Sequence, residues 1–156
     1  MANAAAFSSE AACTCETSRV TISGKPLARF RCHCTICQKV YHAAFADVSV
    51  FWSNAASPVD PMTINYKRYR LPPAIRRGTC SSCGQPIHAL LRVLPFVQIA
   101  FIPTRTIKNT NGLPGVEADI FYDSRNGDVE DSPHTYSGYW ASEMAATRMI
   151  LAGAMR

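Results

Sequence analysis

Seven cysteines, gathered in three short groups, are the residues of this chain best suited to chemistry. They occur as C-T-C at Cys13 and Cys15, C-H-C-T-I-C at Cys32, Cys34 and Cys37, and C-S-S-C-G at Cys80 and Cys83. Short-spaced cysteine thiolates are typical zinc ligands, whereas an odd number of cysteines cannot all pair in disulfides within one chain. Seven thiols fit one four-thiolate site and one three-thiolate site, so we expect two zinc ions per chain.

The group at residues 32–37 carries three thiols within six positions and can bind a metal by itself. A structural zinc is closed by four protein ligands, whereas a catalytic zinc keeps one position for water or substrate. We therefore interpret Cys32, Cys34 and Cys37 as a catalytic zinc site whose fourth ligand is a water or a substrate thiolate. His42 is the alternative fourth ligand, and it would close the site. In an extended strand His33 would point away from its cysteine neighbours, so we do not expect it to bind the metal.

The C-x-x-C pair of Cys80 and Cys83 is half of a structural site, and Gly84 suits the tight turn that such a pair makes. Cys13 and Cys15 can supply the other two thiolates, and the metal would then connect the N-terminal region to the middle of the chain. The spacing alone also allows a different pairing, in which Cys32 and Cys34 join the C-x-x-C pair and leave the first two cysteines free.

The composition and the local patterns around these groups predict a mainly β protein. With 156 residues and a net charge of +5, the chain is long enough for one domain. Alternating apolar residues and turn signals predict short strands, and the last segment has the composition of a helix. Residues 1–11 are expected to form a flexible tail. The predicted strands cover residues 18–24, 45–52, 62–70, 87–94, 96–102 and 119–125, and the predicted helix covers residues 137–156.

The sequence shows no secretory signal and no apolar run of about 18 residues, so we expect a cytoplasmic protein without a membrane span. In the cytoplasm thiols stay reduced, which favours metal binding over disulfides. The stretch 66–77 carries five basic residues interleaved with two tyrosines. Its arginines could bind the carboxylates of a ligand such as glutathione. A basic stretch with interleaved aromatic residues is also typical of nucleic-acid binding. The simpler interpretation is a solvent-exposed strand face.

Taken together, the motifs resemble the glutathione-dependent formaldehyde-activating enzyme family, which also includes the eukaryotic centromere protein V. The resemblance rests on C-T-C-E at residues 13–16, C-H-C-T-I-C-Q-K at 32–39 followed by A-A-F at 43–45, C-S-S-C-G at 80–84, and D-I-F-Y-D-S-R-N-G-D-V-E-D at 119–131. It covers residues 11 to 138. Three positions differ from the usual family pattern: Glu16 replaces a common glycine, Tyr41-His42 replaces a common Ser-Gly, and Asp119 replaces a histidine.

The resemblance implies a single zinc-binding domain over residues 1–156, folded as a β-tent of several small antiparallel sheets around zinc sites, with a C-terminal helix. It implies a structural zinc on Cys13, Cys15, Cys80 and Cys83 and a catalytic zinc on Cys32, Cys34 and Cys37. The implied activity is that of a carbon–sulfur lyase that joins glutathione and formaldehyde into S-hydroxymethylglutathione. Three thiolates make zinc a poor Lewis acid, so we expect the metal to deliver a thiolate rather than to activate the aldehyde.

Two other classes of function remain open at this point. A non-catalytic, zinc-stabilised binding module would carry or sense thiols, and a nucleic-acid module would resemble the centromere branch. We do not expect nucleic acid as the main partner, because the chain lacks a long basic or proline-rich extension.

Overall fold

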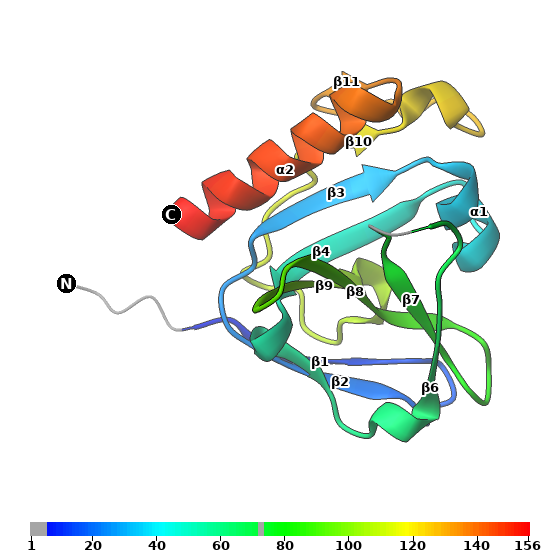
Figure 1. Cartoon of the computed structure of the whole chain (residues 1–156), viewed down its shortest axis with the longest axis vertical. Coiled ribbons are helices and arrows are strands. Elements are labelled where there is room, and N and C mark those ends of the chain that lie inside the picture. The colour runs from blue at the N-terminus through cyan, green and yellow to red at the C-terminus, as the bar shows by residue number, and fades with distance from the viewer. Residues whose placement is uncertain (1–5, 72–73) are drawn as a thin grey trace.

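The computed structural model describes residues 6–71 and 74–156, and within them the mainly β prediction and the C-terminal helix are confirmed (Figure 1). The strands form two sheets, one of three strands and one of eight, in place of several small sheets. The larger sheet is antiparallel except where β10 pairs in parallel with β3 and with β11. Among the described residues, no helix is both long enough and apolar enough to cross a lipid bilayer.

The element bounds follow the sheet order. The small sheet contains β1 (Ser8–Ala12), β2 (Arg19–Ser23) and β5 (Ala56–Pro58). The large sheet runs β11 (Thr135–Tyr136), β10 (Asp119–Ile120), β3 (Ala28–Cys32), β4 (Ala46–Trp52), β9 (Val97–Pro103), β8 (Pro86–Leu94), β7 (Arg76–Cys80) and β6 (Ile64–Lys67). The α-helices are α1 (Thr35–Tyr41) and α2 (Tyr139–Met155), and single 3-10 turns cover Ser53–Ala55, Pro61–Thr63, Thr104–Thr106 and Tyr122–Ser124.

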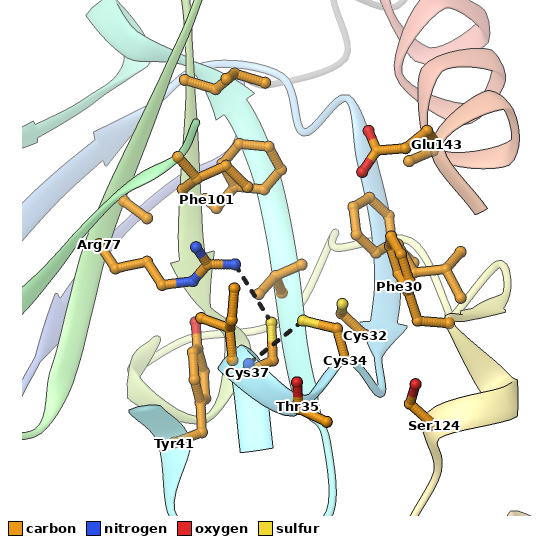
Figure 2. A pocket seen from close by; sticks show the side chains of 18 of the residues that line it. Phe30, Cys32, Cys34, Thr35, Cys37, Tyr41, Arg77, Phe101, Ser124 and Glu143 are labelled. Atoms are coloured by element: carbon orange, nitrogen blue, oxygen red, sulfur yellow. Dashed lines mark hydrogen bonds between the residues drawn. The ribbon is translucent and has the colours of Figure 1, made fainter. Parts of the chain in front are cut away.

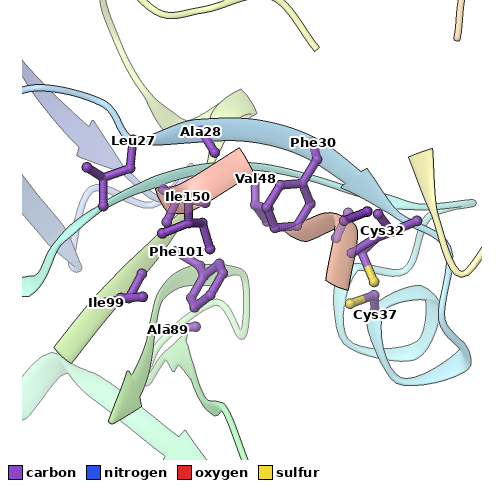
Figure 3. Close-up of a cluster of buried hydrophobic side chains, with 14 of the residues drawn as sticks. Leu27, Ala28, Phe30, Cys32, Cys37, Val48, Ala89, Ile99, Phe101 and Ile150 are labelled. Atoms are coloured by element: carbon purple, nitrogen blue, oxygen red, sulfur yellow. The ribbon is translucent and has the colours of Figure 1, made fainter. Parts of the chain in front are cut away.

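Alternation along the central strands β4 and β9 divides the buried side chains into two clusters. In β9, Phe101 belongs to the cluster beneath α2, while its neighbour Ile102 belongs to the cluster that also contains side chains of the small sheet. In β4, Val50 and Phe51 divide in the same way. Successive residues of a strand point to opposite faces, so each strand serves both clusters. The first cluster, shown in Figure 3, also includes Cys32, so the second cysteine group is built into this core.

Helix α2 lies across the start of β3, and a glycine allows its close approach (Figure 1). A Cβ atom on Gly153 would lie 1.7 Å from the carbonyl oxygen of Leu27, which is far inside van der Waals contact. One turn earlier, Ile150 is buried in the cluster beneath the helix (Figure 3). The position of α2 therefore depends on a glycine at its point of contact with Leu27. Residues of α2 form one wall of the cavity beside the second cysteine group.

Two local expectations were wrong. Residues 8–11, expected in a flexible tail, lie in β1 and pair with β2; residues 1–5 of that tail lie outside the described residues. The strand expected at 119–125 ends at Ile120, because Phe121 adopts a left-handed φ of 54° and a 3-10 turn follows. Ser142 lies buried in the first turn of α2, where its hydroxyl accepts a hydrogen bond from the Phe121 backbone N–H.

Candidate metal centres

The structure brings Cys13, Cys15, Cys80 and Cys83 together, with all four sulfur atoms within 4.8 Å of one another. The Sγ atoms of Cys13 and Cys15 are 3.4 Å apart, and those of Cys15 and Cys80 are 3.6 Å apart. A tetrahedral zinc with Zn–S bonds of about 2.3 Å places its sulfur ligands roughly 3.8 Å apart. The donor set and its spacing therefore fit a four-thiolate zinc, and the alternative pairing of Cys80 and Cys83 with Cys32 and Cys34 is not the one found.

Backbone N–H groups point at the sulfur atoms of this first cluster. Ser18 donates to the Sγ of Cys13 at 3.3 Å, and Ser82 donates to the Sγ of Cys80 at 3.4 Å. Burial raises the pKa of Cys13 to about 11. Burial also acts to raise the pKa of Cys80, but hydrogen bonds from Ser18 and neighbouring backbone groups outweigh it and hold that pKa at about 6. The loops thus stabilise negative charge on sulfur.

Glu16, which replaces a common family glycine, lies in the turn that follows the first two cysteines. It adopts a left-handed φ of 61°, and its N–H donates to the carbonyl oxygen of Cys13 at 3.0 Å. A residue with a side chain tolerates this conformation at a modest cost, whereas glycine adopts it freely. The substitution therefore preserves the turn.

The second cluster forms where β3 passes into α1. Cys32 is the last residue of β3, Cys34 is the N-cap of α1, and Cys37 lies in its first turn (Figure 2). Their sulfur atoms lie within 4.8 Å of one another, and the Cys37 N–H donates to the Sγ of Cys34 at 3.4 Å. A capping residue satisfies a free N–H of the first helical turn. Helix formation at residue 35 therefore turns the second and third thiols toward the first.

These three thiols interact strongly. Contacts with Cys32 and Cys37 lower the pKa of Cys34 to about 2, while the pKa of Cys32 rises well above its ordinary value, chiefly through its contact with Cys34. Among these sulfurs, negative charge is therefore most favourable on Cys34. A divalent cation in place of the remaining protons would allow all three to bind as thiolates.

Arg77 supplies a positive charge beside the second cluster, a role that its position in the basic stretch 66–77 did not reveal. Its Nη2 donates to the Sγ of Cys37 at 3.6 Å (Figure 2). Burial disfavours its charged form, but the adjacent Cys37 raises the pKa of Arg77 above the ordinary arginine value. The guanidinium is therefore a fixed cation that balances negative charge on the sulfurs.

A cavity of about 320 Å³ opens onto the second cluster. Its wall combines residues of β3, β4, β7, β8, β9, α1 and α2 that are distant in sequence. The lining residues are Phe30, Cys32, Cys34, Thr35, Ile36, Cys37, Tyr41, Val48, Arg70, Ile75, Arg77, Ala89, Leu91, Phe101, Ile120, Phe121, Ser124, Glu143, Ala146, Thr147 and Ile150. These residues come from segments distant in the sequence, and only the tertiary fold shows that they surround the cysteines.

The two histidines discussed with the second cluster both lie outside it. His42 is exposed at the C-cap of α1 with a left-handed φ of 47°, and it is not grouped with the three sulfurs. His33 is buried and points away from its neighbouring cysteines, as expected, with its Nε2 donating to Oδ1 of Asp119 at 2.6 Å. Within the described residues, the second cluster therefore offers three candidate protein ligands, and the cavity lies beside them.

Asp119, one of the residues that differ from the family pattern, lies behind the site rather than on the wall of the cavity. Its carboxylate is fully buried and accepts two hydrogen bonds from Arg31, at 2.9 and 2.8 Å, in addition to the one from His33. Arg31 also binds the exposed Asp131 at 2.9 Å. This network joins β3 to β10 directly behind the second cysteine group.

We expect Asp119→Asn to destabilise the protein by about 3–5 kcal/mol, because breaking a buried ion pair leaves Arg31 without its main compensating charge. The free energy of unfolding in urea provides the measurement. Asp131→Asn is the matched control, since it removes an exposed carboxylate from the same arginine and should change little. Equal, small effects of the two substitutions would contradict a stabilising role for the buried pair.

The basic stretch contributes only two of its arginines to the cavity. Arg70 and Arg77 line it, whereas Lys67 and Arg76 stack on Tyr69 and Tyr66 at the surface. Pro72 and Pro73 lie outside the described residues. The acidic residues after β10 make loop contacts, including one between Asp128 and Arg125.

The comparisons with known proteins agree with this geometry. A model of the family described as glutathione-dependent formaldehyde-activating enzyme matches residues 8–124, which contain all seven cysteines. The crystal structure of a Rhodobacter sphaeroides protein, a structural genomics target, is similar with a TM-score of 0.53 and 16% sequence identity, over 69% of this chain and 96% of that chain. At that identity the likeness concerns the fold alone. The search of curated proteins gave no match.

Proposed function

Because this chain belongs to the glutathione-dependent formaldehyde-activating enzyme family, we propose that it is a carbon–sulfur lyase-type enzyme that joins a small thiol to a small aldehyde. The observation that carries the proposal is the second cluster: three converging cysteine sulfurs on the wall of a 320 Å³ cavity, with no fourth protein ligand among the described residues. Three protein ligands and an open position are the arrangement expected of a catalytic zinc rather than a structural one.

The proposed reaction needs no oxidant or further reactant. The thiol loses its proton, a sulfur lone pair forms the C–S bond to the carbonyl carbon, the C=O π electron pair moves to the oxygen, and that oxygen takes up the proton that the thiol lost. When bound, zinc would hold the substrate sulfur as a thiolate at neutral pH. The product is the hemithioacetal, which is S-hydroxymethylglutathione when the substrates are glutathione and formaldehyde.

The protein groups around the cluster suit this chemistry. Arg77 places a permanent positive charge beside Cys37, which favours an anionic sulfur or oxygen in the cavity. Tyr41 also lines the cavity, and burial raises the pKa of its phenol far above the usual value, so that the hydroxyl keeps its proton and acts as a hydrogen-bond donor. The apolar walls limit the access of water, which strengthens both interactions.

The other four cysteines receive a structural role in this proposal. Cys13, Cys15, Cys80 and Cys83 would hold a zinc with four protein ligands, which leaves no position for a substrate. The whole chain would then be one cytoplasmic zinc-binding domain with a closed metal site and an open one.

The test of the open site is a change in the spectrum of the metal on adding a thiol. In the cobalt-substituted protein, glutathione or another small thiol should shift the visible absorption bands, because its sulfur enters the coordination sphere. The S-methyl analogue has nearly the same shape but cannot form a thiolate, so it should leave the bands unchanged. Identical spectra with both compounds would contradict the open site. Thiol binding without faster hemithioacetal formation would instead identify a thiol carrier or sensor.

A further inference from the structure

The wall of the cavity above the second cluster is mostly apolar. Phe30 and Val48 project from β3 and β4, Leu91 and Phe101 from β8 and β9, and Ile150 from α2 on the opposite side. The rings of Phe30 and Phe101 meet edge to face with centroids 6.5 Å apart. Figure 2 shows these two rings on the side of the cavity away from Tyr41 and Thr35, with the sulfurs between. A molecule whose sulfur reaches the cysteines must therefore place its adjacent atoms against hydrocarbon.

The charged groups on this wall already have partners. Arg77 donates to the Sγ of Cys37, and Arg70 lies 3.7 Å from Glu143 at the half-exposed rim. Glutathione carries two carboxylates, an ammonium group and two peptide units, each of which needs a partner when it leaves water. Burying such groups without partners is unfavourable, and most of all for the charged ones. Apart from these two arginines and Glu143, the polar side chains that line the cavity are the three cysteines and the neutral hydroxyls of Thr35, Tyr41, Ser124 and Thr147, and neutral hydroxyls do not balance the charges of glutathione.

The size of the cavity also bears on the substrate. A volume of about 320 Å³ lies within the range of pockets that enclose small organic ligands, roughly 300–1,000 Å³. Formaldehyde has only two heavy atoms and would occupy a small part of this space. The thiol must therefore supply most of the contacts.

We propose that the thiol bound by this site carries an apolar alkyl or aryl body next to its sulfur, so that the natural substrate is a hydrophobic low-molecular-weight thiol rather than glutathione. The inference rests on the proposed function, because it assumes that the sulfur binds at Cys32, Cys34 and Cys37. It adds the substrate class: the body of the thiol lies between Phe30, Phe101 and Ile150.

A homologous series of thiols measures the apolar contacts directly. Calorimetric titration of the zinc-loaded protein with ethanethiol, butanethiol and hexanethiol should show about four-fold tighter binding per methylene group, the value expected when each group leaves water. In the same titrations 6-mercaptohexanoate, whose far end is charged, should bind more weakly than hexanethiol. Glutathione should bind more weakly than butanethiol.

Two leucine substitutions locate the contact. Leu91→Asn changes a residue of the wall, whereas Leu94→Asn changes an exposed residue three positions along the same strand. We expect the first substitution to weaken hexanethiol binding roughly ten-fold and to leave ethanethiol binding within about two-fold, because only the longer chain contacts the wall. The second should change neither. Thermal melts of both variants establish whether they are folded. If the Leu91→Asn variant does not fold, the thiol series on the unaltered protein still tests whether the site prefers apolar thiols.

The outcomes separate this inference from the proposed function. Affinity that does not increase with chain length, or glutathione binding more tightly than hexanethiol, overturns the apolar substrate class while the thiol site stands. A cobalt spectrum and a calorimetric signal that respond to no thiol overturn the proposed function itself, and this inference with it.

Discussion

Replacing Cys80 by serine will unfold the protein or lower its melting temperature severely. Cys80 ends β7 in the large sheet, whereas Cys13 and Cys15 follow β1 in the small sheet. Cys15 and Cys80 are 65 positions apart in the sequence. A metal held by these residues joins the two sheets and closes a long loop. Structural zinc contributes about 10–16 kcal/mol of apparent binding energy, which is comparable to the whole stability of a typical domain, about 5–15 kcal/mol.

Circular dichroism during thermal unfolding is the measurement, with and without a strong zinc chelator. Serine keeps the size of cysteine while removing the soft sulfur ligand. Ser81→Ala changes the next, exposed residue of the same turn and serves as the control. A Cys80→Ser variant that melts within a few degrees of the unaltered protein would show that the first cluster does not hold the fold together.

Replacing Cys37 by serine will abolish thiol binding and leave the protein folded. The second cluster spans only residues 32–37, so its metal constrains a short piece of chain, and strand pairing already holds β3 on two sides. Loss of one of three ligands removes the metal on which the substrate sulfur depends. We expect thiol affinity to fall by more than about 100-fold, because changing a residue that only supports a ligand already costs roughly 10–100-fold in metal affinity.

Calorimetric titration with the best-binding thiol and a thermal melt test this pair of effects together. Lys39→Ser, an exposed substitution on α1, provides the control for changes in that helix. If Cys37→Ser unfolds the chain while Cys80→Ser is tolerated, the structural and catalytic assignments of the two clusters are reversed.

The grouping of the cysteines into clusters that could bind metal could be predicted from the sequence, because their short spacings already restrict the geometry. C-x-x-C and C-x-C place sulfurs near one another whatever the rest of the chain does. The pairing of Cys13 and Cys15 with Cys80 and Cys83 was left open by the spacing, because it depends on the contact between two sheets. His33 was correctly expected to point away from the cysteines, although its buried partner Asp119 could not be foreseen.

The cavity could not be predicted from the sequence. Phe101 lies in a predicted strand, whereas Phe30 lies in β3, a strand that the sequence analysis missed, and nothing in the sequence shows that the two rings meet. The position of α2 depends on Gly153 against the Leu27 backbone, a contact that no helical pattern reveals. The strand expected at residues 119–125 ends at Ile120 because Phe121 has a left-handed backbone conformation. The high β-strand propensity of phenylalanine predicts the opposite.

The zinc content of the intact protein tests the central claim most directly. Native mass spectrometry of gently purified protein should find two zinc ions on the unaltered chain and one on the folded Cys37→Ser variant, because each cysteine cluster holds one ion. Addition of a small thiol should then add one thiol per chain to the first protein and none to the second. A single zinc or none on the unaltered chain, with loss during handling excluded by adding zinc back, would contradict the two-site account.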